Sequence, residues 1–142
     1  MDKQDEQDKR DAGFLHSDLT ESIIGCAFDV SNELGAGFLE SVYENALAIA
    51  LRERGLTVRA QVPIDVHFRG QLVGKFYADL LVGEKVIVEL KSVSSLTPQH
   101  EAQVINYLSA TDIAVGLLIN FGNPRLQYRR VTRRRSPFTR RF

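Results

Sequence analysis

The sequence has only one cysteine among its 142 residues, and none of its apolar runs is long. A single cysteine excludes an internal disulfide and a zinc site built from several thiolates. Cys26 falls in an apolar helical pattern, which predicts a buried, unreactive thiol. The three histidines, His16, His67 and His100, are not spaced as a zinc cluster, and each is expected at the surface.

A membrane-spanning helix is also missing from the pattern, because it would need about 18 or more consecutive apolar residues. The N-terminus is acidic and polar, unlike a secretory signal. We therefore expect a soluble, cytoplasmic protein that makes no use of a membrane.

The net charge of zero hides an uneven distribution of charge. Residues 1–21 and 22–124 each carry a net charge of −4, whereas residues 125–142 carry +8 and no acid. Arginines in such a segment attract phosphate backbones, and Arg133, Arg134 and Arg135 are the expected nucleic-acid contacts. A solvated tail that pairs with the protein's own acidic surface explains the charge equally well.

Length and composition predict three segments. Residues 1–12 are charged and lack periodicity, so we expect them to be disordered. Residues 13–131 have the length and apolar content of one domain, and residues 132–142 form an arginine-rich tail.

Periodicity and turn residues predict an α/β fold, a central mixed sheet flanked by helices. The expected elements, in order, are helix 17–34, helix 39–54, strands 56–68, 72–82 and 85–93, helix 97–111, strand 113–121 and an edge strand at 125–131. Short turns between the first three strands favour an antiparallel meander, whereas a helical crossover makes the next strand parallel. Thr97 is expected to cap the helix that follows it, with Glu101 as its capping partner.

A charged triplet stands inside the strand "VIVELKSV". Side chains alternate along a strand, so Glu89 and Lys91 share one face. Charged residues are seldom buried unless they are paired or bind a metal. Taken alone, the triplet is better explained as an ion pair at a wet end of the sheet.

A second acid, Asp79, lies in the preceding strand. If residue 82 pairs with residue 85, Asp79 faces Val88, and a shift of one residue places it opposite Glu89; the sequence does not fix this register. Two adjacent carboxylates repel each other, and a divalent cation such as Mg²⁺ would relieve the repulsion.

Two helical patterns carry further polar residues. Glu40 stands in the first turn of helix 39–54 with Tyr43 one turn later, and acids favour a helix N-terminus in any case. Gln103 and Tyr107 share a face of the next helix, where an ordinary polar stripe is the alternative.

The string Gly37-x-x-Glu40-x-x-Tyr43 resembles the motif of the GxxExxY proteins, in the PD-(D/E)xK nuclease-like superfamily. The resemblance extends from about Leu19 to Val131 and includes, in the expected order, "LGAGFLESVYENAL", "YADLLV", "VIVELKSV", "QVINYL" and "VGLLINFG". It implies a restriction-endonuclease-like core of the order α-β-β-β-α-β.

The resemblance also implies roles for these residues. Asp79 and Glu89 would hold Mg²⁺ or Mn²⁺, with the backbone carbonyl of Leu90 as a further ligand and Glu40 as an outer one. Lys91 would orient the attacking water or stabilise charge on the phosphate. A metal and a lysine arranged in this way suit phosphodiester hydrolysis.

Gln103 and Tyr107 resemble the Q-x-x-x-Y helix of RecB-like nucleases, which supports the site and approaches the nucleic acid. Ser31 and Ala36 depart from the His and Pro that family members often carry at these positions. If that histidine serves the site, Ser31 puts full activity in question.

The leading hypothesis is a metal-dependent nuclease acting on DNA or RNA, and small nuclease-like domains suggest a homodimer by analogy. One alternative is a non-catalytic nucleic-acid-binding or regulatory module that uses the arginine tail. Another is a small assembly protein whose polar strand is structural.

Overall fold

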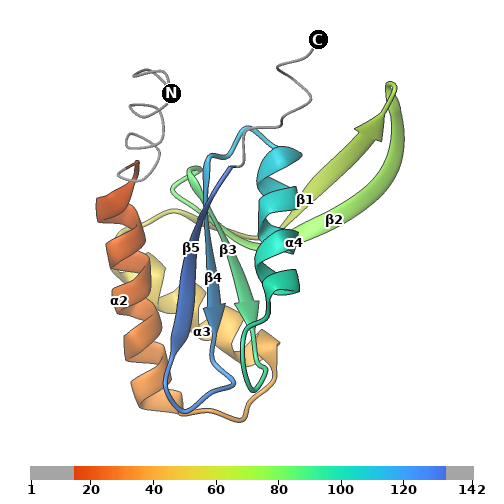
Figure 1. The fold of residues 1–142 in the computed structure, drawn as a ribbon. Helices are drawn as coiled ribbons and strands as arrows, with labels where there is room; N and C mark the ends of the chain where they lie inside the picture. Colours follow the sequence, from red (N-terminus) through yellow and green to blue (C-terminus); the bar gives the residue numbers. More distant parts are fainter. Residues whose placement is uncertain (1–14, 134–142) are drawn as a thin grey trace, which may run out of the picture.

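A five-stranded mixed sheet lies between two layers of helices (Figure 1). The computed structural model describes residues 15–133. Its elements are α2 (Ser17–Leu34), α3 (Glu40–Glu53), β1 (Val58–Phe68), β2 (Gln71–Val82), β3 (Val86–Lys91), α4 (Pro98–Ser109), β4 (Val115–Asn120) and β5 (Gln127–Thr132). The strand order is β1-β2-β3-β4-β5. Only the β3–β4 pair among these strands is parallel, so the predicted α/β fold with a mixed sheet is confirmed.

Each face of the sheet has its own hydrophobic core. The helices α2 and α3 pack on one face through residues such as Ile23 and Leu47, and α4 packs on the other through Val104 and Leu108. Strands β3 and β4 lie in the middle and are buried along nearly their whole length. Cys26 is buried in the first core, and burial raises the pKa of its thiol, as expected of an unreactive cysteine.

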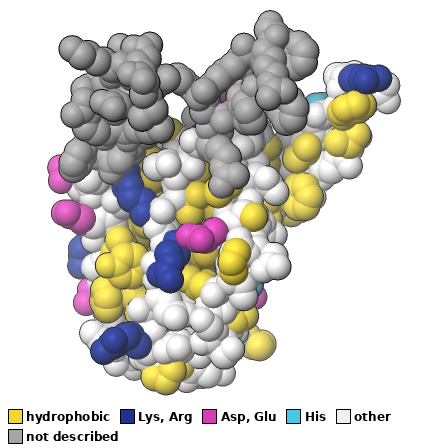
Figure 2. All heavy atoms as spheres, viewed as in Figure 1, with side chains coloured by type: hydrophobic (Ala, Val, Ile, Leu, Met, Phe, Trp, Pro, Cys, Tyr) yellow, Lys and Arg dark blue, Asp and Glu magenta, His cyan; other side chains and the backbone are white. Residues whose placement is uncertain are grey.

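The β1–β2 hairpin extends beyond the sheet as an arm, which we define as residues 62–78 (Figure 1). Hydrophobic side chains are exposed along this arm (Figure 2). They are Phe68, Leu72, Val73, Phe76 and Tyr77. Leu80 belongs to the core of α2 and α3, whereas Ala78 belongs to the core of α4, although strict alternation would put both on one face. The hairpin therefore changes faces where it leaves the sheet.

The register between β2 and β3 differs by one residue from our main expectation. Val82 pairs with Val86 and not with residue 85. Gly83 and Glu84 both have positive φ, and the turn is closed by the Lys85 N–H, which donates to the Val82 carbonyl over 3.0 Å. Because Lys85 belongs to the turn, the strands shift by one residue and Asp79 comes opposite Glu89.

The helix and strand ends contain two further differences. Thr97 precedes α4 as predicted, but its partner is His100, whose Nδ1 accepts a hydrogen bond from the Thr97 N–H at 3.0 Å, and not Glu101. Strand β5 continues to Thr132, and the Arg133 N–H donates to the Ala114 carbonyl at 3.0 Å. The sheet thus includes Thr132, which the sequence predicts to be part of the arginine-rich tail.

None of the helices within residues 15–133 is both long and apolar enough to cross a membrane.

Candidate metal-binding active site

The β2–β3 ladder opens at Asp79 and Glu89. Regular pairing ends at Leu80 and Val88, and beyond it the two carboxylates replace backbone acceptors. The Asp79 N–H donates to Oε1 of Glu89 at 2.9 Å, and the Leu90 N–H donates to Oδ2 of Asp79 at 2.8 Å. Each acid is therefore held by the backbone of the opposite strand, which fixes both carboxylates at one point of the sheet.

Burial makes this pair electrostatically unfavourable as long as both acids are charged. Glu89 is 4% exposed, and its pKa is raised to about 8, first by burial and then by the charge of Asp79. The Asp79 N–H and the charge of Lys91 lower that pKa only in part. Burial also raises the pKa of Asp79, against the Leu90 N–H, Gln61 and Lys91. A bound cation would relieve both effects.

Lys91 is half-buried on the same face of β3, two residues after Glu89. Lys91 forms no ion pair within 4 Å with an acid among residues 15–133. The ion pairs of that part of the chain, apart from any that involve Arg130, are Arg54–Asp29 and Arg59–Glu84. Lys91 is thus close enough to influence both carboxylates without being locked to either one.

The Gly37–Glu40–Tyr43 string shapes the turn that precedes α3. Gly37 has a φ of 114°, which favours glycine. Tyr43 is buried; its hydroxyl donates to the Gly35 carbonyl at 2.6 Å and accepts from the Phe38 N–H at 3.1 Å. These contacts place Glu40 at the first position of α3, where it is exposed and its negative charge contributes to the raised pKa of Glu89.

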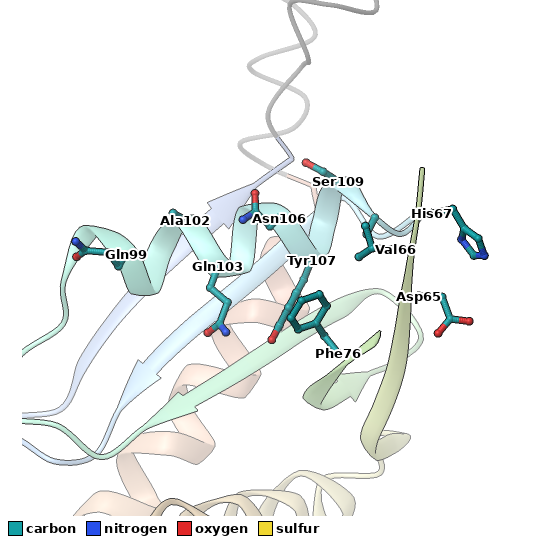
Figure 3. A pocket seen from close by; sticks show the side chains of 11 residues that line it. Asp65, Val66, His67, Phe76, Gln99, Ala102, Gln103, Asn106, Tyr107 and Ser109 are labelled. Carbon is teal, nitrogen blue, oxygen red and sulfur yellow. The ribbon is translucent and has the colours of Figure 1, made fainter. Parts of the chain in front are cut away.

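Gln103 and Tyr107 line a cleft of about 770 Å³ between α4 and the arm. Both side chains point from α4 toward the strands, with Phe76 beside Tyr107 (Figure 3). The Phe76 and Tyr107 rings are 5.8 Å apart between centroids. Burial raises the pKa of the Tyr107 hydroxyl, and the charges of Glu89 and Asp79 raise it further. Neither carboxylate lines the cleft itself, but Tyr107, which does, is close enough to feel the charge of both.

Sequence reasoning missed two residues of this site, Glu44 and Gln61. Nε2 of Gln61 donates to Oε1 of Glu44 at 2.6 Å and to Oδ1 of Asp79 at 3.4 Å. Burial raises the pKa of Glu44, and the charges of Asp79 and Glu40 add to this effect. The available signal was the spacing of Glu44, one helical turn after Glu40 on the same face.

The arginines proposed for nucleic-acid binding divide into two groups. Nε of Arg133 donates to the Leu108 carbonyl at 3.1 Å, and Nη2 donates to the carbonyls of Thr111 and Ile113. Arg133 therefore caps the C-terminal end of α4, and its contact with nucleic acid stays a prediction. Arg134 and Arg135 lie outside the described residues, as do residues 1–12.

The donor atoms fit a hard divalent cation that keeps several waters. Within residues 15–133, no three acids, histidines or cysteines are gathered as a complete metal site. Asp79 and Glu89 supply two carboxylates. The Lys91 carbonyl accepts from the Phe121 N–H of the chain beyond β4 at 2.9 Å, so the alternating Leu90 carbonyl faces β2. Mg²⁺ commonly takes one or two carboxylates and completes its shell with water and substrate oxygens.

In this α/β core, two carboxylates interrupt the pairing of two strands, and a lysine follows on the same face of one of them. This arrangement is typical of nuclease-like proteins. A model of the PD-(D/E)XK nuclease superfamily matches residues 17–131, and the chain belongs to this superfamily. The match does not separate the narrower GxxExxY group from the rest of the superfamily. No curated protein matches the chain.

The fold also resembles that of a solved protein, in the crystal structure of SSO0001. The TM-score is 0.55 at 17% sequence identity, and the similarity covers 90% of this chain and 65% of that one. The chain thus spans about two thirds of that protein's length. At this identity the likeness supports the fold alone, which agrees with the restriction-endonuclease-like core that we expected.

Proposed function

We propose that this protein is a nuclease that hydrolyses phosphodiester bonds of DNA or RNA with Mg²⁺ or Mn²⁺. The observation that carries the proposal is the pair of carboxylates near Lys91, each held by the opposite strand, with Glu89 buried and Asp79 half-buried. A structural ion pair between Glu89 and Lys91 would give no reason for a second acid, Asp79, to face Glu89. A cation-binding site gives one, because the cation offsets the mutual repulsion of the two acids.

In this proposal, the residues of the site have separate roles. Asp79, Glu89 and the Leu90 carbonyl would hold the metal, and Glu40 would bind its outer waters. When bound, the metal supplies an activated water and neutralises charge on the phosphate. Lys91 adds a fixed positive charge for the phosphate oxygens. Gln103 and Tyr107 face the nucleic acid in the adjoining cleft.

The direct test is Mn²⁺ titration calorimetry on the wild type, Asp79→Asn, Glu89→Gln and Lys91→Ala, with cleavage assays on DNA and RNA. We expect at least a 10-fold loss of Mn²⁺ affinity in the two acid variants. Lys91→Ala should still bind Mn²⁺ but lose cleavage, because it leaves both carboxylates in place and removes the positive charge that would meet the phosphate. Asp112→Asn, an exposed acid away from the site, is the matched control.

Two outcomes would decide against the proposal. Cleavage that persists in EDTA and in Asp79→Asn would show that the activity lies elsewhere. A wild type that binds nucleic acid but neither binds Mn²⁺ nor cleaves would support the alternative, a non-catalytic nucleic-acid-binding or regulatory module.

A further inference from the structure

Gln61 interrupts β1 at the level of Asp79. Its φ is 51°, in the left-handed region that residues other than glycine seldom adopt. The β1–β2 ladder passes from the Ala60–Leu80 pair to the Val62–Ala78 pair and skips Gln61. Such conformations cost free energy and tend to occur where a side chain must be re-aimed, often beside active sites.

The re-aimed amide lies between two carboxylates. Nε2 of Gln61 donates to Oε1 of Glu44 at 2.6 Å and to Oδ1 of Asp79 at 3.4 Å. The other oxygen of Asp79 accepts from the Leu90 N–H. Asp79 is therefore held from β1 and from β3 at once.

The short bond to Glu44 decides which way the amide points. A carboxylate accepts from N–H and never donates when ionised, so Glu44 turns the nitrogen of Gln61, and not its oxygen, toward the acids. Glu44 lies on α3, the helix that also presents Glu40. The contact ties the acids of α3 to β1, whose Gln61 in turn reaches Asp79 on β2.

We propose that Gln61 and Glu44 are positioning residues of the metal site, Gln61 orienting the Asp79 carboxylate and Glu44 fixing the Gln61 amide. This inference rests on the proposed function. Hydrogen bonds that orient metal-binding side chains commonly change metal affinity by about 10- to 100-fold when they are removed. A tie that served only to join α3 to β1 would affect unfolding and leave metal affinity unchanged.

The test is Mn²⁺ titration calorimetry on the full chain, comparing Gln61→Gly and Glu44→Ala with the wild type. Glycine adopts a positive φ without strain, so Gln61→Gly removes the amide and keeps the backbone. We expect the Mn²⁺ Kd to rise by about 10-fold or more in Gln61→Gly and in Glu44→Ala. Glu53→Ala, an exposed acid on the same helix, is the control and should bind as the wild type does.

The outcomes separate this inference from the proposed function. If Asp79→Asn loses Mn²⁺ while both Gln61→Gly and Glu44→Ala bind it as the wild type does, the positioning role is wrong and the metal site stands. If the wild type binds no Mn²⁺, both ideas fail. Should Gln61→Gly not fold, Glu44→Ala decides alone, because it changes a half-buried helical side chain and leaves the strand intact.

Discussion

In the metal-free protein, Glu89 retains a proton at neutral pH, because burial and the charge of Asp79 raise its pKa to about 8. The ordinary pKa is 4.5, and the unfolded chain ionises near that value. Between these two values the folded state holds more protons than the unfolded state. The stability of the wild type should therefore fall as the pH rises through this window.

The prediction at this scale concerns Glu89→Gln, which keeps an acceptor for the Asp79 N–H but cannot ionise. In EDTA, this variant should be more stable than the wild type at pH 8, by an amount on the order of a few kcal/mol. The difference should nearly vanish at pH 5. Urea unfolding at the two pH values measures it.

The control for this experiment is Glu53→Gln, an exposed acid on α3. It should follow the wild type at both pH values. If the stability of Glu89→Gln and of the wild type falls in parallel between pH 5 and pH 8, Glu89 does not hold the additional proton. That result would contradict the raised pKa of Glu89.

At the scale of elements, the loop after β3 is bonded to the end of β4. Asn120, at the end of β4, is buried; its Oδ1 accepts from the Val93 N–H at 3.0 Å, and its Nδ2 donates to the Val93 carbonyl at 2.9 Å. Gly122 packs directly against this loop. A Cβ at Gly122 would lie 2.3 Å from both the nitrogen and the oxygen of Val93.

Gly122→Ala should therefore destabilise the protein by about 2 kcal/mol or more, because backbone atoms cannot yield as a flexible side chain can. Urea unfolding measures the loss. Gly25→Ala is the matched control, since the atoms nearest to its Cβ belong to the end of the flexible Arg54 side chain, from 3.3 Å. In a helix interior this change should be neutral or stabilising by up to about 1 kcal/mol. Equal stability of the two variants would contradict the close approach at Val93.

At the scale of the whole molecule, the positive charge is concentrated in residues 125–142, at the C-terminal end of the chain. Deleting residues 125–142 would remove β5, which pairs with β4 along its length. Truncation after Arg133 keeps β5 and the cap on α4, and it removes four arginines. This truncation is the clean test of the tail.

We expect the truncated protein to unfold at the same urea concentration as the full chain and to bind nucleic acid less tightly. If all four arginines contact phosphates, the slope of log affinity against log salt should become shallower by up to about 4. Binding measured by fluorescence anisotropy at several salt concentrations gives the slope. An unchanged slope would mean that the tail pairs with the protein's own acidic surface instead.

The sequence by itself determined the order of the elements and most of the candidate site. Helical and strand periodicity depend on residues near one another, so α2, α3 and the three strands of the meander could be predicted from local pattern. The resemblance then named Asp79, Glu89 and Lys91. Residues 1–12 and 134–142 lie outside what the structure describes, so the expectations for them stay predictions.

Only the tertiary structure decided how these pieces meet. The register that puts Asp79 opposite Glu89 depends on whether Lys85 belongs to the turn, and a shift of one residue moves every side chain across the sheet. Gln61 and Glu44 come together from a strand and a helix, and a positive φ in mid-strand leaves no local mark in the sequence. The sequence predicts that Arg133 belongs to a basic tail, but its guanidinium donates to carbonyls at and just beyond the C-terminal end of α4. Each of these outcomes depends on contacts between distant segments, whose free energies local sequence pattern does not contain.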